Sequence, residues 1–152
     1  MFARYNNILY GCVKYDNTYH LITQSPAKTD SSFREDNGGF FVSDIKISDP
    51  MLTDLFDADL YVIYKGVPCK VSLGTDSFDK HYPDTLVITV FESSLYHPYK
   101  TYRRVKLSDL ESGKIRYYRY KFAGHENRKV IVEDMELPVS IIRDKEKEFY
   151  NV

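Results

Sequence analysis

The sequence predicts an α+β protein that is predominantly antiparallel β, with small curved sheets or partly open barrels and one or two short helices. Aromatic residues make up 15% of the chain, and they are enriched in strands. The apolar runs are short and are separated by Asn, Asp and Gly, which favour turns. Before the last ten residues no apolar pattern extends over three helical turns, which excludes the crossover helices of a doubly wound parallel sheet.

The N-terminal elements begin with a predicted hairpin. Its strands cover 8–15 and 19–23, and Asp16-Asn17-Thr18 between them tolerates the positive φ of a tight turn. A second turn is expected at Asp36-Asn37-Gly38-Gly39 and is followed by a strand over 40–47.

A short helix is expected after this strand. Ser48-Asp49-Pro50 offers a capping side chain and then a proline at a first helical position. Residues 51–56 are therefore expected to form one or two helical turns.

The second half of the chain shows further strand patterns. The turn Lys65-Gly66 joins two of them. The tail, 143–152, is highly charged and is expected to be a frayed helix or a solvated end. The predicted strands cover 60–64, 67–73, 85–91, 105–107, 115–122, 129–132 and 137–142.

The length favours one compact unit over residues 1–152. Two fused β-rich subdomains over 1–59 and 60–142, followed by the tail, are the other arrangement that the length permits. Internal sequence similarity supports the second arrangement. The segment FARYNNI, from Phe2, aligns with YVIYKGV, from Tyr61, and the segment IKISD, from Ile45, aligns with VKLSD, from Val105. This similarity predicts an internal repeat.

Charge is distributed unevenly although the net charge is only -1. Residues 95–121 hold eight basic and two acidic side chains, whereas residues 1–60 hold five basic and nine acidic ones. The low total argues against a globally basic nucleic-acid binder.

No motif for catalysis or for phosphate binding is present, and we expect no enzyme activity, no cofactor and no metal site. The histidines His20, His81, His97 and His125 have no spacing typical of metal ligands. Cys12 and Cys69 lie in apolar strand patterns, where we expect small buried thiols and no disulfide.

The basic segment alternates tyrosines with cations. This pattern fits a half-buried sheet, an interface with a protein partner, or a surface for single-stranded nucleic acid. Carboxylates elsewhere in the chain could instead face a basic partner. The candidate partner-binding residues are Tyr99, Tyr102, Arg103, Arg104, Arg116, Tyr118, Arg119 and Tyr120, together with Asp54, Asp57 and Asp59.

The N-terminus lacks the apolar run of a signal peptide, and no apolar stretch reaches 18 residues. We therefore expect a cytoplasmic protein that does not act at a membrane.

Several segments of residues 1–110 carry a resemblance to a known group of proteins. FARYNNILYG, YDNTYHLITQSPAKTDSSF, FFVSDIKISD and YVIYKG together resemble the layout of small cytosolic immunity proteins that Gram-positive bacteria encode beside secreted polymorphic toxins. The resemblance implies an inhibitor that masks a cognate toxin by stoichiometric binding. The acidic residues would face a basic nuclease toxin, and the Tyr/Arg segment would face an acidic one. The alternative is a nucleic-acid-binding module of phage or mobile-element origin.

Overall fold

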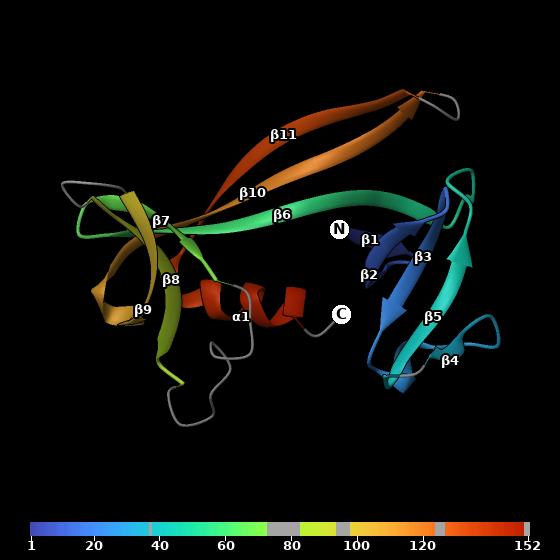
Figure 1. Ribbon diagram of the computed structural model, residues 1–152, viewed down its shortest axis with the longest axis horizontal. Helices are drawn as coiled ribbons and strands as arrows, with labels where there is room; N and C mark the ends of the chain where they lie inside the picture. Colours follow the sequence, from blue (N-terminus) through green and yellow to red (C-terminus); the bar gives the residue numbers. More distant parts are fainter. Residues whose placement is uncertain (37, 73–82, 94–97, 124–126, 151–152) are drawn as a thin grey trace. The chain divides into compact units, whose positions relative to one another are not determined.

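The computed structural model describes residues 1–36, 38–72, 83–93, 98–123 and 127–150, and these residues form a mostly antiparallel β-sheet protein with one α-helix (Figure 1). The predicted fold class is confirmed. The elements are β1 (Phe2–Tyr5), β2 (Ile8–Tyr15), β3 (Thr18–Thr23), η1 (Pro26–Lys28), β4 (Arg34–Asp36), β5 (Phe40–Ile45), β6 (Leu52–Tyr64), β7 (Val67–Val71), β8 (Thr85–Ser93), β9 (Pro98–Lys106), η3 (Leu107–Asp109), β10 (Leu110–Ala123), β11 (Asn127–Leu137) and α1 (Val139–Tyr150).

The chain forms two compact units. The first contains Met1–Ala58 and Tyr117–Glu133, and the second contains Asp59–Arg116 and Asp134–Tyr150. The strands β6, β10 and β11 each contribute one part to each unit.

The first unit is built on an antiparallel sheet with the strand order β4-β5-β3-β2-β1-β6. Its two tight hairpins turn at Asn6-Asn7 and at Asp16-Asn17, and all four of these residues have positive φ. Asn and Asp tolerate that conformation better than most residues, which explains why they occupy these turns. The hairpin predicted at Asp16-Asn17 is confirmed.

The core of the first unit lies on one face of this sheet. Strand alternation buries Cys12, and its cross-strand partner Leu21 is fully buried. The ring of Tyr10 stacks on Phe33 at a centroid distance of 5.6 Å, and its hydroxyl donates to the carbonyl of Lys28 at 2.7 Å. The core therefore buries apolar surface and also provides a hydrogen-bond acceptor for the buried hydroxyl of Tyr10.

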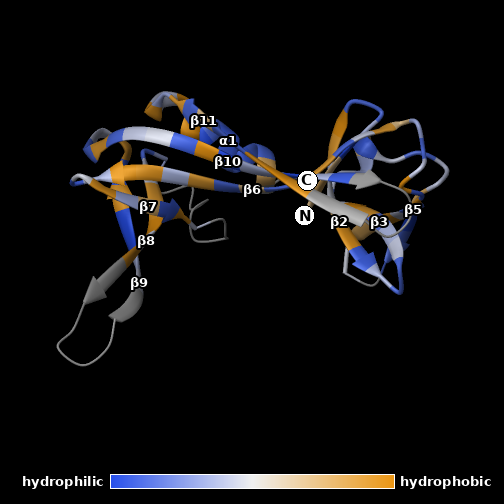
Figure 2. Cartoon of the chain, turned by 90° about the horizontal axis from the view of Figure 1, so that it is seen from above, coloured by the Kyte–Doolittle hydropathy of each residue, from blue (hydrophilic) through white to orange (hydrophobic). Residues whose placement is uncertain are grey.

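In the second unit β7 pairs with β6 and β8, and β9 pairs with β8, all antiparallel. The hairpin between β6 and β7 turns at Lys65-Gly66, as predicted, and both residues have positive φ. Apolar and polar residues alternate along β6 between Phe56 and Val62 (Figure 2). The buried positions of the second unit come from its strands and from α1, and they include Leu60, Val62, Cys69, Val71, Leu86, Ile88, Val105, Ile115, Leu137, Ile142 and Phe149.

Two predicted elements are wrong. Residues 51–56 form a turn and then the start of β6 in place of a short helix. The strand predicted over 137–142 is instead the last residue of β11 and the first turn of α1. This helix also includes most of the tail, which was predicted to be a frayed helix or a solvated end, and Phe149 within it is buried.

Some predictions fall outside the described residues, namely Asn37 of the second turn and Leu73 at the end of a predicted strand. The internal repeat stays a prediction. No helix in the described part of the chain has the length and apolar character needed to cross a membrane.

Candidate functional site

The predicted partner-binding residues are divided between the two units. The acidic residues lie on β6, and the tyrosines and arginines lie on β9 and β10. Tyr99 lies in β9, but its side chain is outside the described part. The first unit holds Asp54, Asp57, Tyr118, Arg119 and Tyr120, and the second holds Asp59, Tyr102, Arg103, Arg104 and Arg116.

In the first unit, Arg119 of β10 is held by carboxylates from two other strands. Its guanidinium contacts Asp54 of β6, and its Nε donates to Glu133 of β11 at 2.8 Å. The same guanidinium lies over the rings of Tyr117 and Phe56, at 4.9 and 5.7 Å from their centroids. Arg119 therefore joins strands within this unit, which is a structural role for a residue predicted to bind a partner.

The other two predicted acidic residues also have partners within the chain. Asp57 accepts a hydrogen bond from Tyr120 and lies 3.1 Å from the N-terminal amine of Met1. In the second unit, Asp59 lies 2.5 Å from Nζ of Lys70. All three predicted carboxylates are thus paired intramolecularly, which lowers the charge that they offer to a basic partner.

In the second unit Arg116 and Lys114 of β10 converge on Asp134 of β11. Arg116 makes a bidentate pair, with Nε 2.7 Å from Oδ1 and Nη2 2.8 Å from Oδ2, and Lys114 Nζ lies 3.1 Å from Oδ2. The hydrogen bonds from Arg116, and then those from Lys114, hold the pKa of Asp134 well below its usual value. Both cations also lie over the ring of Tyr61, at 5.8 and 6.0 Å.

Strand β9 presents its cations differently. Tyr102 is 63% exposed, and Arg103, Arg104 and Lys106 are exposed as well. The residues directly opposite them on β8 are uncharged: Thr89, Ile88, Val87 and Thr85. Nη1 of Arg104 donates to the hydroxyl oxygen of Thr85 at 3.2 Å.

The strand register places these groups on one face of the second unit. Tyr61 is opposite Lys70, Lys70 is opposite Thr89, and Thr89 is opposite Tyr102. Directly opposite residues project from the same face of a sheet. Arg104 and Lys106 follow Tyr102 at intervals of two and share its face. We call this surface the Tyr/cation face, and it comprises Tyr61, Lys70, Tyr102, Arg104, Lys106, Lys114 and Arg116.

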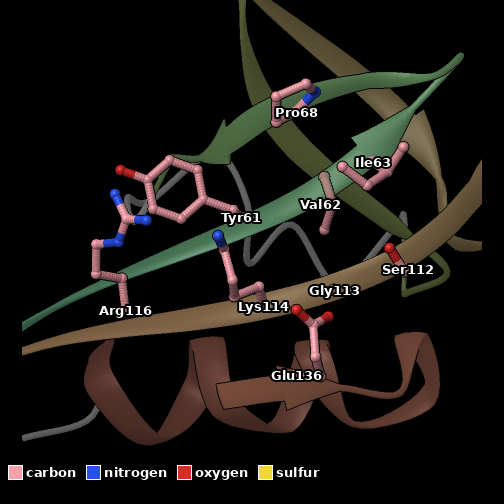
Figure 3. A pocket seen from close by; sticks show the side chains of 9 residues that line it. All are labelled: Tyr61, Val62, Ile63, Pro68, Ser112, Gly113, Lys114, Arg116 and Glu136. Carbon is pink, nitrogen blue, oxygen red and sulfur yellow. The ribbon is translucent and has the colours of Figure 1, made fainter. Parts of the chain in front are cut away.

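A pocket of about 400 Å³ opens within this face. Figure 3 shows Tyr61, Lys114 and Arg116 close together at one end of it, with Ser112 and Glu136 elsewhere along the lining. The other lining residues are Val62, Ile63, Pro68 and Gly113. An apolar floor with charged groups around it is suited to holding an anchoring side chain or a small ligand.

Neither cysteine offers a reactive thiol. Cys12 and Cys69 are buried and form no disulfide, and burial raises the pKa of Cys12 to about 11. His20 lies 2.8 Å from Asp44, whereas His81, His97 and His125 are outside the described residues. In the part of the chain that the structure describes, no group of three His, Cys, Asp or Glu side chains is placed to hold a metal ion.

Sequence reasoning missed Tyr61 and Lys70 of the Tyr/cation face, and it placed Lys106 and Lys114 in the basic segment without selecting them as candidate binding residues. The alternation of β6 could have placed Tyr61 on the face opposite the buried Leu60 and Val62. The convergence of Tyr61 with Lys114 and Arg116 could not be found in this way, because it depends on the pairing of β6 with β10.

Comparisons with protein-family models, with curated proteins and with solved structures give no match to this chain.

Proposed function

We propose that this chain is a protein-binding inhibitor, an immunity protein that masks a cognate bacterial toxin by stoichiometric binding. The observation that carries the proposal is the Tyr/cation face, where the exposed Tyr102 lies beside Arg104 and Lys106. Tyrosine and arginine are the residue types most enriched among interface positions that dominate binding energy. The inhibitor would act without catalysis, by covering a surface that the toxin needs.

The charge of this face favours an acidic surface on the toxin. Asp54, Asp57 and Asp59 are each paired within the chain, so they are poorly suited to meet a basic partner. The exposed cations Arg103, Arg104 and Lys106 of β9 would steer an acidic partner into contact. Of the two partner types expected from the sequence, the geometry therefore supports the acidic one.

A protein partner accounts for this face better than nucleic acid does. Affinity for a phosphate backbone grows with the number of phosphates that Lys and Arg side chains neutralise. In the described part of β9 only Arg103, Arg104 and Lys106 are basic and exposed, and Arg116 and Lys114 on β10 are bound to Asp134. A small group of exposed cations beside Tyr102 suits a protein interface, in which a few anchoring residues dominate the binding energy.

The test is co-expression of the chain with the product of the adjacent open reading frame. We expect rescue of growth and a one-to-one complex by size-exclusion chromatography with light scattering. The double substitution Arg104→Glu with Lys106→Glu should weaken the complex at least about 100-fold, because it reverses the charge at the centre of the interface.

The matched control is Lys14→Glu with Lys46→Glu, which changes the net charge equally at two exposed positions of the first unit. It should leave binding and rescue unchanged. An equal loss of binding in both double variants would show that net charge causes the effect. The Tyr/cation face would then be rejected as the binding surface. Failure of the unaltered chain to bind or neutralise the neighbouring product would remove the proposed function.

The nucleic-acid alternative is decided by fluorescence anisotropy with a single-stranded oligonucleotide. We expect any binding at low salt to disappear at about 150 mM salt, where exposed charges are strongly screened. Tight binding that persists there, and that is lost in the Arg104→Glu, Lys106→Glu variant, would favour the alternative.

A further inference from the structure

Strand β9 lies at the end of the strand order of the sheet. In the described part of the chain it pairs with β8 and with no other strand (Figure 1). An edge strand can add a further strand through its outward backbone groups, and such strand addition is a recurrent mode of peptide recognition. The edge belongs entirely to the second unit, because β9 covers Pro98–Lys106.

The hydrogen bonds of β8 show which backbone groups of β9 point outward. The C=O of Val87 accepts a hydrogen bond from the N–H of Ser72 at 2.8 Å, so the backbone groups of Val87 point toward the end of β7. Val87 is opposite Arg104, and this pair is therefore one of the antiparallel pairs without mutual hydrogen bonds. The N–H and C=O of Arg104 consequently point away from β8. Because these directions alternate along a strand, the same holds for Tyr102 and Lys106.

The side chains of β9 leave room for an added strand on both faces of the sheet. Tyr102 is 63% exposed, and Arg103 and Arg104 are exposed as well. Neighbouring side chains of a strand project from opposite faces, so three consecutive exposed residues place solvent on both faces at this point. The side chains of an incoming strand can therefore lie beside those of β9 on either face.

The charge of this edge selects an acidic strand. Residues 101–107 contain Arg103, Arg104 and Lys106 and no carboxylate. Cross-strand pairs of opposite charge stabilise a sheet, whereas like charges opposite one another destabilise it. A second copy of β9 would bring cations against cations, so this strand is unsuited to pair with itself. A strand that carries carboxylates at alternate positions would instead meet Arg104 and Lys106 on the Tyr/cation face.

We propose that the edge of β9 binds an acidic strand of the partner by antiparallel strand addition, the arrangement that β8 and β9 already have. Two carboxylates, two residues apart in the incoming strand, lie opposite Lys106 and Arg104, and the next residue on that face packs against the ring of Tyr102. The backbone of the incoming strand bonds to the outward N–H and C=O groups of these three residues. The inference deepens the proposed function and rests on it for the source of the strand, which is the toxin.

The test is binding of the synthetic peptide TEVETYT, blocked at both ends and labelled with fluorescein, to the full chain, measured by fluorescence anisotropy. In the proposed register its glutamates lie opposite Lys106 and Arg104, and its tyrosine lies opposite Tyr102. We expect saturable binding to the unaltered chain. Arg104→Glu with Lys106→Glu should raise the dissociation constant at least about tenfold. The peptide TKVKTYT should bind this double variant more tightly than it binds the unaltered chain.

Methylation of single backbone nitrogens of the peptide separates strand pairing from charge attraction. In the proposed register the N–H groups of both glutamates point toward β9, and the N–H of the valine between them points away. Methylation of the second glutamate nitrogen should therefore weaken binding at least about tenfold, whereas methylation of the valine nitrogen should change it less than about threefold. The two methylated peptides have the same charge and the same mass.

The matched control on the protein is Lys14→Glu with Lys46→Glu, at exposed positions of the first unit. It should leave peptide binding unchanged, and circular dichroism should show that both double variants fold. Equal effects of the two methylations would overturn strand addition by β9, and so would an unaltered chain that does not bind the peptide.

Complex formation with the product of the adjacent open reading frame is measured separately. A complex with that product, without binding of the peptide, would leave the proposed function standing and reject β9 as the edge for an acidic strand. Binding of the peptide with the expected effects of methylation, without that complex, would support the edge and reject the toxin as the source of the strand.

Discussion

Arg116 and Asp134 form a two-point ion pair between β10 and β11. Nε of the guanidinium lies 2.7 Å from Oδ1 and Nη2 lies 2.8 Å from Oδ2, while Lys114 approaches Oδ2 at 3.1 Å. Planar, two-point contacts of this kind restrict geometry more than a single contact does. The pair therefore fixes how the two strands meet in the second unit, in addition to lowering the pKa of Asp134.

The Arg116–Asp134 pair predicts how acid changes stability. The folded pKa of Asp134 is depressed, so the stabilisation is complete well above the unfolded pKa of about 3.9 and is lost as the pH falls toward the folded pKa. We expect Asp134→Asn to lower the free energy of unfolding at neutral pH. The difference from the unaltered chain should stay level down to about pH 5 and shrink below about pH 4. Urea unfolding across this range measures it.

Asp109→Asn is the control for the acid experiment, because Asp109 is exposed and lies in η3, away from this pair. It should give a small difference that shows no comparable change with pH. A difference for Asp134→Asn that is as large at about pH 3 as at about pH 5 would show that the pair does not titrate in this way.

Gly113 of β10 is required by a close approach of α1. A Cβ at this position would meet Cγ1 of Ile142 at 2.7 Å and the carbonyl oxygen of Leu137 at 3.2 Å. Ile142 is fully buried and has little space into which to move. We expect Gly113→Ala to lower the free energy of unfolding by about 1–3 kcal/mol, which is typical of an overpacked core.

Gly38→Ala is the matched control, because its added Cβ would meet its nearest neighbour, in Phe40, at 3.5 Å. It should change stability by less than about 0.5 kcal/mol. Adding Ile142→Ala to Gly113→Ala should cost less than the sum of the two single changes, because the side chain in conflict is removed. Additive losses would reject the proposed close contact.

The hairpin turns were predictable from sequence, and the element after Asp49 was not. Asn17 and Gly66 tolerate positive φ, so local chemistry alone identifies their turns. Asp49 was interpreted as a helix cap, and its side chain does accept a hydrogen bond from the N–H of Met51 at 2.9 Å. The same bond also stabilises a turn between strands. Pairing of β6 with β1 then decides the outcome, and local sequence does not report that pairing.

The sequence predicted which types of residue form the candidate site, but it did not predict which of these residues pair with one another. The sequence identified the basic segment and the carboxylates Asp54, Asp57 and Asp59 as possible binding groups. The structure places Arg119 against Glu133 and Arg116 against Asp134. Which cations are matched in this way depends on strand register, and a one-residue shift would place every side chain on the other face.

Burial of Cys12 predicts slow thiol chemistry. Burial raises its pKa to about 11, and the nucleophile is the thiolate. In the folded chain near pH 8, a thiol reagent should label Cys12 at least about 100-fold more slowly than in urea. Mass spectrometry of the labelled peptides measures both rates. Equal rates in the folded and unfolded chain would contradict the buried position.

The raised pKa of Cys12 also implies a loss of stability in alkali. The contribution of the buried Cys12 thiol to the free energy of unfolding is complete below the unfolded pKa of about 8.5. It decreases as the pH rises toward the folded pKa of about 11. Cys12→Ala should therefore show a shallower decrease in the free energy of unfolding between about pH 8.5 and pH 10. Parallel curves for the two proteins would contradict the assignment.

The most buried ion pair in the described part of the chain tests whether charge or packing matters more in α1. Nη1 of Arg143 donates to Oε2 of Glu146 at 2.7 Å, and the side chains are only 9% and 0% exposed. Removing one partner leaves the other charge buried, so Arg143→Met should cost about 3–5 kcal/mol. Replacing both residues, with Arg143→Met and Glu146→Leu, should cost less than Arg143→Met alone, because no uncompensated charge remains.

The same helix supplies a matched control in Lys145 and Glu148, which have the same spacing and are partly exposed. Lys145→Met should cost less than about 1 kcal/mol, because water solvates the remaining carboxylate. Urea unfolding of the four proteins gives the comparison. If the double variant is less stable than Arg143→Met, the lone carboxylate of Glu146 costs less than a leucine at its position, and the expected order is reversed. If the double variant is less stable than the unaltered chain, the ion pair contributes more to stability than the two apolar side chains that replace it.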